Sequence, residues 1–217
     1  MPVIAVDGPA AAGKGSLSRH LAAEFGLPHL DTGMLYRIVA LDLLNAGQAV
    51  TDAEAAVLAA ARIDLGRYTD AELRARHMGE AASVVSAIPE LRLALLQFQV
   101  DFAARDGGAV LDGRDIGTVI CPDADLKLFV TASPSVRARR RTDEILRRGE
   151  PCDYDTVLAD IIRRDERDSS RGSAPLAAAA DAHVFDTTDM GYEEMKAAAV
   201  ALASSVLGRL QPAAVPA

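Results

Sequence analysis

The sequence contains no tryptophan, only two cysteines and only three lysines in 217 residues. Cys121 and Cys152 offer neither metal-ligand spacing nor a disulfide framework, so we expect a reducing, cytoplasmic setting. No stretch approaches 18 consecutive apolar residues and the start lacks a basic signal-peptide segment, so we expect no membrane span and no leader. A formal net charge of −8 argues against a general nucleic-acid or anionic-membrane binder.

Arginine carries almost all of the positive charge. Twenty of the 23 basic residues are arginines, and ten of them lie between Arg137 and Arg171 together with nine acidic residues. The guanidinium group is a planar fork that binds phosphate or carboxylate through two parallel hydrogen bonds. The segment is therefore predicted to be a dense field of anion-binding donors rather than a basic tail.

Short apolar runs alternate with helix-length segments along the chain. The runs are predicted to be strands, at residues 3–6, 29–30, 109–111, 126–130 and 182–185. The predicted helices are at residues 14–25, 33–45, 89–104, 134–148, 154–170 and 192–209. Continuous apolar runs of this length are typical of buried parallel strands. The alternation predicts an α/β fold with a parallel sheet flanked by helices.

Two stretches interrupt this alternation, residues 46–87 and residues 142–172. We expect both to be insertions on one face of a single core, so that residues 1–210 form one domain. The length of the chain is sufficient for one domain with a sizeable core. Residues 211–217 are rich in proline and alanine and are expected to form a disordered tail.

A glycine-rich segment connects the first predicted strand to the first predicted helix. It reads Gly8-Pro9-Ala10-Ala11-Ala12-Gly13-Lys14-Gly15-Ser16. Strand, G-x4-G-K, hydroxyl residue and helix is the context of a phosphate-binding loop, in which backbone amides surround a phosphate. Lys14 is placed to reach the β- and γ-phosphates, and the Ser16 hydroxyl to ligate Mg²⁺. The alternative is an ordinary glycine-rich turn.

The segment D-T-G-M-L-Y-R at residues 31–37 is a second candidate. Asp31 and Thr32 are good helix N-cap residues, so a helix is predicted to start here, with Arg37 in its second turn. Taken alone, a cap followed by a surface arginine explains the segment equally well.

The segment D-G-R-D-I-G-T at residues 112–118 directly follows a predicted strand. In open α/β sheets, ligands bind outside the carboxyl ends of the strands. The adjacent Arg114 and Asp115 are flanked by glycines that permit close approach, which favours a binding site over a solvated turn.

The fourth candidate lies in the arginine-rich stretch, at residues 163–171. Arg164, Asp168 and Arg171 are spaced i, i+4 and i+7, so a helix would bring them to one face. A solvent-exposed face of ion pairs is the alternative.

Together these segments resemble the bacterial cytidylate (CMP/dCMP) kinase family of P-loop nucleoside monophosphate kinases. The resemblance covers residues 3–190, nearly the whole chain, and its most specific part is G-R-D-I-G-T. The segments that carry it are G-P-x-x-x-G-K-G-S, D-T-G-x-x-Y-R, G-R-D-I-G-T followed by C-P-D-A, and R-D-x-x-D-x-x-R followed by A-P-L. It implies a P-loop kinase core, a monophosphate-binding insertion at about 46–87 and a helical lid at about 142–172.

The implied reaction is transfer of the γ-phosphate of ATP to CMP or dCMP, giving ADP and CDP or dCDP, in a protein we expect to be a monomer. ATP with its Mg²⁺ would be held by residues 8–16, with Ser16 on the metal. Lys14, Arg114, Arg164 and Arg171 would be the catalytic residues.

The resemblance also assigns residues to the acceptor nucleotide. The acceptor phosphate, the cytosine and the sugar would each have their own contacts. These are Thr32, Arg37, Arg114 and Arg171 for the phosphate, Ser83, Arg92 and Asp115 for the base, and Arg164 and Asp168 for the sugar.

Three other functions are alternatives on the sequence alone. A related P-loop kinase acting on UMP, AMP or a non-nucleotide metabolite shares the loop but not the G-R-D-I-G-T segment. A GTP-binding switch requires an N-K-x-D guanine reader, which the sequence lacks. An inactive relative would not need Lys14, Ser16 and the arginines.

Overall fold

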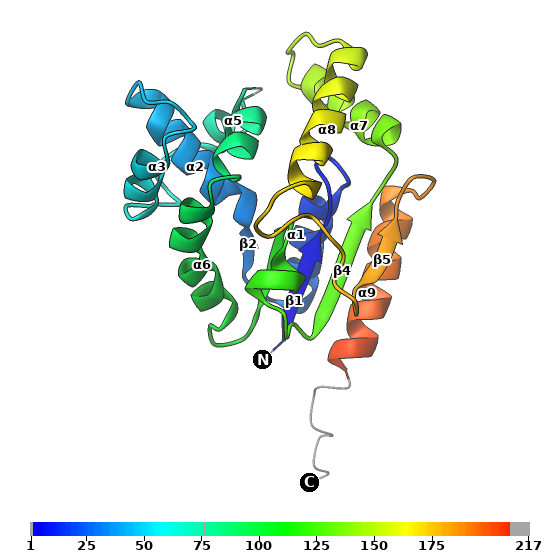
Figure 1. Cartoon of the computed structure of the whole chain (residues 1–217). Coiled ribbons are helices and arrows are strands. Elements are labelled where there is room, and N and C mark those ends of the chain that lie inside the picture. Colours follow the sequence, from blue (N-terminus) through cyan, green and yellow to red (C-terminus); the bar gives the residue numbers. More distant parts are fainter. Residues whose placement is uncertain (1, 76, 209–217) are drawn as a thin grey trace.

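The structure of the protein, a computed structural model, describes residues 2–75 and 77–208 (Figure 1). The expected tail at residues 211–217 and the expected helix end at residue 209 lie outside the described residues. Within them, five parallel strands form one sheet in the order β2-β3-β1-β4-β5. The bounds are β1 Val3–Asp7, β2 His29–Asp31, β3 Ala109–Gly113, β4 Leu126–Thr131 and β5 His183–Asp186. The predicted α/β fold with a parallel sheet is confirmed.

Helices follow the strands in alternation, and most begin where the sequence predicts. α6 and α7 each start with a proline, whose missing N–H has no intrahelical role in the first turn. The helices are α1 Lys14–Phe25, α2 Thr32–Asn45, α3 Ala53–Ala60, α4 Asp70–Leu73, α5 Met78–Val85, α6 Pro89–Ala103, the π-helix η1 Ile116–Ile120, α7 Pro134–Arg147, α8 Tyr154–Ser169 and α9 Tyr192–Leu207.

The core lies on both faces of the sheet. α1 and α9 pack on one face, where Leu21 and Ala199 meet Ile4 and Val6 of β1. α6 and η1 cover the other face, around Ala5. Because β1 is central and is buried from Ile4 to Asp7, the loop that follows it emerges in the middle of the carboxyl edge of the sheet. This is the position at which open α/β sheets bind ligands.

The two stretches that interrupt the alternation fold into helical layers beside and above the sheet (Figure 1). The first contains α3, α4 and α5, which share an apolar cluster with α2 and α6. The second contains the end of α7 and all of α8, which pack on each other around Ala138, Ile145, Val157 and Ile161. α7 itself begins earlier, at Pro134, directly above β4.

All five strands end one or two residues later than predicted, β3 by the most, and β5 also differs in its position in the sheet. β3 continues through Asp112 and Gly113, which the sequence pattern placed in the loop, because both residues still pair with neighbouring strands. β5 is an edge strand rather than a buried one, and Val184 is 63% exposed. An apolar run by itself does not distinguish an edge from a central strand, since an edge strand also packs one of its faces.

Both cysteines are free thiols, Cys121 buried and Cys152 only partly buried. Burial raises the pKa of Cys121 to about 11, which keeps that thiol protonated and unreactive. Cys152 packs, partly buried, against the apolar cluster of α7 and α8. In the ranges that the structure describes, no single helix is long and apolar enough to cross a membrane.

Candidate active site

A pocket of about 870 Å³ opens at the carboxyl edge of the sheet, between the loop after β1, the first insertion and helices α7 and α8. Ten arginines and Lys14 line it, against seven carboxylates. The chain as a whole has a net charge of −8, so positive charge is concentrated here. Such a site favours a ligand with several negative charges.

The loop after β1 has the backbone that a phosphate-binding loop requires. Gly8 has φ +146°, and a Cβ at this position would lie 2.0 Å from the carbonyl oxygen of Val130. Gly13, at the start of α1, has φ +95°. Ala11 adopts φ 60° without being a glycine, which costs on the order of 1 kcal/mol. Its methyl group packs against the apolar cluster of α7 and α8.

Six of the nine predicted loop residues reach the pocket wall, namely Ala10, Ala11, Gly13, Lys14, Gly15 and Ser16. Gly8, Pro9 and Ala12 do not line it. Ala12 is fully buried, and Gly8 packs against the backbone of β4. The Pro9 carbonyl accepts a hydrogen bond from the Lys14 ammonium at 3.3 Å. These three residues support the loop from behind the pocket wall.

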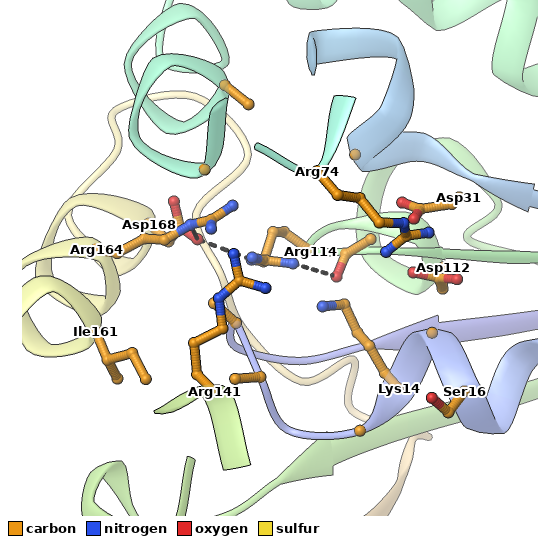
Figure 2. Close-up of a pocket in the computed structure, with 18 of the residues that line it drawn as sticks. Lys14, Ser16, Asp31, Arg74, Asp112, Arg114, Arg141, Ile161, Arg164 and Asp168 are labelled. Carbon is orange, nitrogen blue, oxygen red and sulfur yellow. Dashed lines mark hydrogen bonds and ion pairs between the residues drawn. The ribbon is translucent and has the colours of Figure 1, made fainter. Parts of the chain in front are cut away.

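Lys14 lies at the bottom of the pocket, and Figure 2 shows its side chain pointing toward those of Arg114, Arg141 and Arg164. Burial, together with the charge of Arg114, lowers the pKa of Lys14 to about 7. The carboxylates of Asp112 and Asp31 oppose this shift without cancelling it. A phosphate beside Lys14 would favour its charged form.

Two carboxylates face the loop from neighbouring strands. Asp31 ends β2 and Asp112 pairs with it in β3, and His29 Nε2 contacts Asp112 Oδ2 at 2.7 Å. Burial and the nearby Asp112 raise the pKa of Asp31. A Cβ built at Gly15 would lie 3.9 Å from both Asp112 carboxylate oxygens, so this carboxylate faces the start of α1, near Ser16. A hydroxyl oxygen and a carboxylate oxygen are suitable protein ligands for a divalent cation that is bound to phosphates.

The arginines predicted to lie on one face of a helix meet around a single buried carboxylate. Asp168, 1% exposed, accepts from Arg114 Nε at 2.8 Å and from Arg171, and lies 4.0 Å from Arg164. Burial alone would raise the pKa of Asp168, but these three charges hold it below its ordinary value. α8 ends at Ser169, so Arg171 reaches the cluster from beyond the helix and not from its face.

Two of these guanidinium groups keep a free donor. Arg164 Nε and Arg171 Nε are buried and have no hydrogen-bond partner among the described residues. Burial, with the charge of Arg114 adding to it, lowers the pKa of Arg164 to about 9. Buried donors in native proteins are nearly always satisfied, so these two indicate an anionic ligand in the pocket.

Arg92 of α6 and Asp115 also line the pocket and form a buried ion pair. Their side chains are 9% and 6% exposed. The Arg92 guanidinium also lies 5.8 Å from the centre of the Tyr36 ring. An acceptor and a donor side by side match the hydrogen-bonding edge of a nucleobase.

Two predicted acceptor-site residues are placed differently. Ser83 is 1% exposed and does not line the pocket; its hydroxyl accepts from Arg167 Nη1 at 2.8 Å. Ser86, one helical turn later, lines the pocket instead and accepts from Arg171 Nη2 at 3.1 Å. Thr32 does line the pocket, but its hydroxyl donates to the Asp112 carbonyl at 2.8 Å. That hydrogen is therefore not directed at a phosphate.

Arg37 lies in the wall as predicted, donating to the carbonyl of Leu73 at 2.6 Å, and burial lowers its pKa to about 10. Four further residues line the pocket without a role predicted from the sequence, namely Arg74, Arg140, Arg141 and Asp112. Arg140 and Arg141 belong to the arginine-rich stretch, and Asp112 opens the D-G-R-D segment, so a signal for these three was present. Arg74, which lies beside Asp31 and Asp112 in Figure 2, had none.

The family model described as cytidylate kinase matches residues 4–205. A cytidylate kinase of Methylocella silvestris is 59% identical over 203 residues, covering 94% of each chain. One of Rhodopseudomonas palustris (strain BisB18) is 56% identical over 204 residues, covering 94% of this chain and 96% of that protein.

Among solved structures, an uncharacterized protein from Eubacterium ventriosum aligns with a TM-score of 0.54 at 12% identity. The alignment covers 96% of this chain and 100% of that one, and shows similarity of fold alone. The family match shows more than the fold, because it is a match in sequence that extends over nearly the whole chain and includes every segment that lines the pocket. The chain belongs to the cytidylate kinase family.

Proposed function

We propose that this protein transfers the γ-phosphate of ATP to CMP or dCMP. The observation that carries this proposal is one pocket that is lined by a phosphate-binding loop, an arginine cluster and a buried Arg92–Asp115 pair. The loop fits the triphosphate of the donor, the pair fits the base of the acceptor, and the arginines fit the charge that develops between them.

On the donor side, the loop amides and Lys14 would hold the phosphates of ATP. The Lys14 ammonium can turn to a phosphate, because the one hydrogen bond it makes among the described residues is to the carbonyl of Pro9, at 3.3 Å. Mg²⁺ bound to ATP would be held by the Ser16 hydroxyl, and the Asp112 carboxylate, which also lines the pocket, would add negative charge for the cation. The cation would neutralise phosphate charge during transfer.

On the acceptor side, we assign Arg37, Arg114 and Arg171 to the phosphate of CMP. Arg92 and Asp115 would face cytosine, while Arg164 and Asp168 would lie nearer the sugar. Thr32 and Ser83 support the walls: Thr32 through Asp112, and Ser83 through Arg167.

No general base is required for this transfer. The acceptor oxygen is already anionic at neutral pH, since the second pKa of a phosphate monoester is about 6. Catalysis then depends on alignment and on neutralising charge as the phosphoryl group moves. Lys14, Arg114, Arg164 and Arg171 are the groups placed to do both.

We further propose that residues 142–172 act as a lid over the pocket. Arg148 of this segment donates to the carbonyl of Arg74 at 3.0 Å, and Arg167 pairs with Glu80 at 2.6 Å. Both contacts join the lid to residues 46–87, the proposed monophosphate-binding insertion. A lid that brings arginines together only over bound substrates limits wasteful hydrolysis of ATP.

We also propose that the enzyme is a cytoplasmic monomer, which agrees with two free thiols and a −8 net charge. Size-exclusion chromatography with light scattering should give the mass of one chain, 22.8 kDa.

The proposed reaction is tested by ADP release from ATP and Mg²⁺ with CMP, dCMP, UMP, AMP and GMP as acceptors. We expect rapid release with CMP and dCMP and little with the other three. Equal rates with UMP would favour a broader pyrimidine kinase, and release independent of any acceptor would indicate an ATPase.

The affinity for ATP should depend on the protonation of Lys14. Its pKa of about 7 in the free protein means that binding of phosphates draws in a proton above pH 7. The Kd for ATP should therefore rise with pH above 7, by up to about tenfold per unit, and level off below 7. Isothermal titration in two buffers of different ionisation enthalpy measures the proton uptake.

The control for this titration is Lys14→Arg, whose guanidinium stays charged throughout the range. It should show neither the pH dependence nor the proton uptake, whatever its affinity. A wild-type Kd that is constant between pH 6.5 and pH 8.5 would contradict the assignment.

The arginine cluster predicts unequal effects of two substitutions. Arg171→Ala should lower kcat/KM for CMP by roughly 10²-fold, because a charge-assisted donor to the moving phosphate is lost. Asp168 keeps Arg114 and Arg164 as partners, so the fold should survive.

Arg163→Ala is the matched control, since Arg163 is 52% exposed and pairs only with Asp160 nearby. It should change kcat/KM by less than about twofold, as exposed ion pairs contribute little. Equal losses in the two variants, measured by steady-state kinetics, would mean that the cluster is a solvated ion-pair face.

A further inference from the structure

Asp7, the last residue of β1, is a buried carboxylate that does not line the pocket. Its two oxygens accept hydrogen bonds from two consecutive backbone amides. Oδ1 accepts from Ile116 N and Oδ2 from Gly117 N, both at 2.8 Å. These are the first N–H groups of η1. The first N–H groups of a helix have no hydrogen-bond partner within that helix. The carboxylate therefore fixes the start of η1.

The position of Asp7 links two loops that carry different parts of the site. Asp7 directly precedes Gly8 and the phosphate-binding loop, while η1 directly follows Arg114 and Asp115. In the sheet, Asp7 pairs in register with Gly113, the residue before Arg114. The carboxylate thus spans from the base of the donor loop to the end of the acceptor turn.

We infer that Asp7 is a positioning residue for the acceptor nucleotide: it holds the Arg114–Asp115 turn in place relative to the phosphate-binding loop. The inference rests on the proposed function, because it concerns the geometry between ATP and CMP. Asp7 touches neither substrate and acts through the backbone of the turn.

Other residues lie close to the backbone of the Arg114–Asp115 turn and restrict its movement together with the Asp7 contact. At its start, a Cβ at Gly113 would lie 2.6 Å from Thr32 Oγ1, and the Thr32 hydroxyl donates to the Asp112 carbonyl. After it, a Cβ at Gly117 would lie 3.4 Å from Asp7 Oδ2. Thr32 and Asp7 therefore hold the backbone at the two ends of the turn. A shift of about 1 Å at reacting groups costs roughly 10²-fold in rate.

The charge of the buried Asp7 carboxylate is compensated by the amides that it holds. Burial raises the pKa of Asp7 to about 6, although the two amides and Lys14 act in the opposite direction, and the negative charge of Asp115 adds to the rise. A buried carboxylate is costly unless hydrogen bonds satisfy it. Here both oxygens are satisfied by the amides that follow the acceptor turn.

Asp7→Asn tests the inference, because it keeps the shape and one acceptor but replaces the other oxygen with an NH₂ group that cannot accept from an N–H. We expect KM for CMP to rise by about tenfold or more and the preference for CMP over UMP to fall. KM for ATP should stay within about threefold of wild type, since the phosphate-binding loop keeps its own backbone contacts.

The control is Leu126→Ala. Leu126 is 2% exposed and starts β4, at the end of the sheet away from the pocket. It should lower the melting temperature without moving either KM or the CMP/UMP ratio. A purely structural Asp7 would behave like Leu126, so unchanged CMP kinetics in folded Asp7→Asn would overturn the inference.

If Asp7→Asn fails to fold, Gly117→Ala gives the same test by crowding Asp7 Oδ2 and the Lys127 side chain. A raised KM for CMP with an unchanged KM for ATP supports the inference, and equal changes in both overturn it. A wild-type protein inactive on CMP would refute the proposed function itself, and the parallel wild-type assay separates that result from failure of the positioning role.

Discussion

Lys14→Ala should lower kcat/KM for phosphoryl transfer by roughly 10³-fold or more, because it removes the one lysine that reaches the donor phosphates. Lys14 begins α1, and within residues 2–75 and 77–208 its ammonium makes one hydrogen bond, to a backbone carbonyl of the loop. Burial lowers the pKa of Lys14 to about 7, so the folded protein without ligand gains little from this charge. The melting temperature should therefore fall little or even rise.

Lys196→Ala serves as the control, since Lys196 of α9 forms an ion pair with Glu193 and does not line the pocket. Its kcat/KM should match wild type within about twofold. Circular dichroism confirms folding in both variants, and steady-state ADP release gives the rates. Undiminished turnover of folded Lys14→Ala would remove the loop from the mechanism.

The second large effect concerns the choice of base. Cytosine presents an amino donor beside two acceptors, and uracil reverses the pattern at two of these three positions. Asp115 can accept from the amino group, and Arg92 can donate to the ring nitrogen and carbonyl. A site built to bond a polar group rejects a mismatched analogue by roughly 10⁴-fold. Wild type should favour CMP over UMP in kcat/KM by that order.

Asp115→Asn should shrink this preference by roughly 10- to 100-fold, the equivalent of one hydrogen bond to a charged group. Its amide can offer a donor to uracil, so the repulsion of UMP is lost together with the attraction of CMP. The Asn variant nearly preserves volume beside Arg92, where both side chains are buried.

Asp125→Asn is a suitable control for this measurement. Asp125 is exposed and its carboxylate accepts from Val3 N at 2.8 Å, at the opposite end of the sheet. The CMP/UMP ratio should not change in this variant. A ratio equally unmoved by Asp115→Asn would reject the base assignment and reopen a UMP-kinase reading.

Much of the fold was predictable because local chemistry determines it. The VIAVD run, with alternating faces both buried, produces a central strand, and Gly8 and Gly13 supply the backbone that the following loop needs. Likewise, proline at positions 89 and 134 marks helix starts. These features depend on residues close in the sequence, so a single sequence reveals them.

Features that depend on tertiary contacts were less accessible. Ser83 was expected to face the base, but Arg167, 84 residues away in the chain, occupies its hydroxyl. Arg171 was expected on a helical face and instead reaches Asp168 from beyond the helix end. Arg74 enters the pocket from an insertion whose sequence carries no motif. The spacing of residues in a sequence does not show which side chains from different insertions will be in contact.

The central claim is that one pocket places the γ-phosphate of ATP on the phosphate of CMP. It is tested most directly by incubating the wild-type protein with [γ-³²P]ATP, Mg²⁺ and CMP and separating the products. The account predicts that the label appears in the β-phosphate of CDP, at a rate equal to ADP formation. Label found mainly in inorganic phosphate, or carried to UMP as readily as to CMP in a competing mixture, would contradict it.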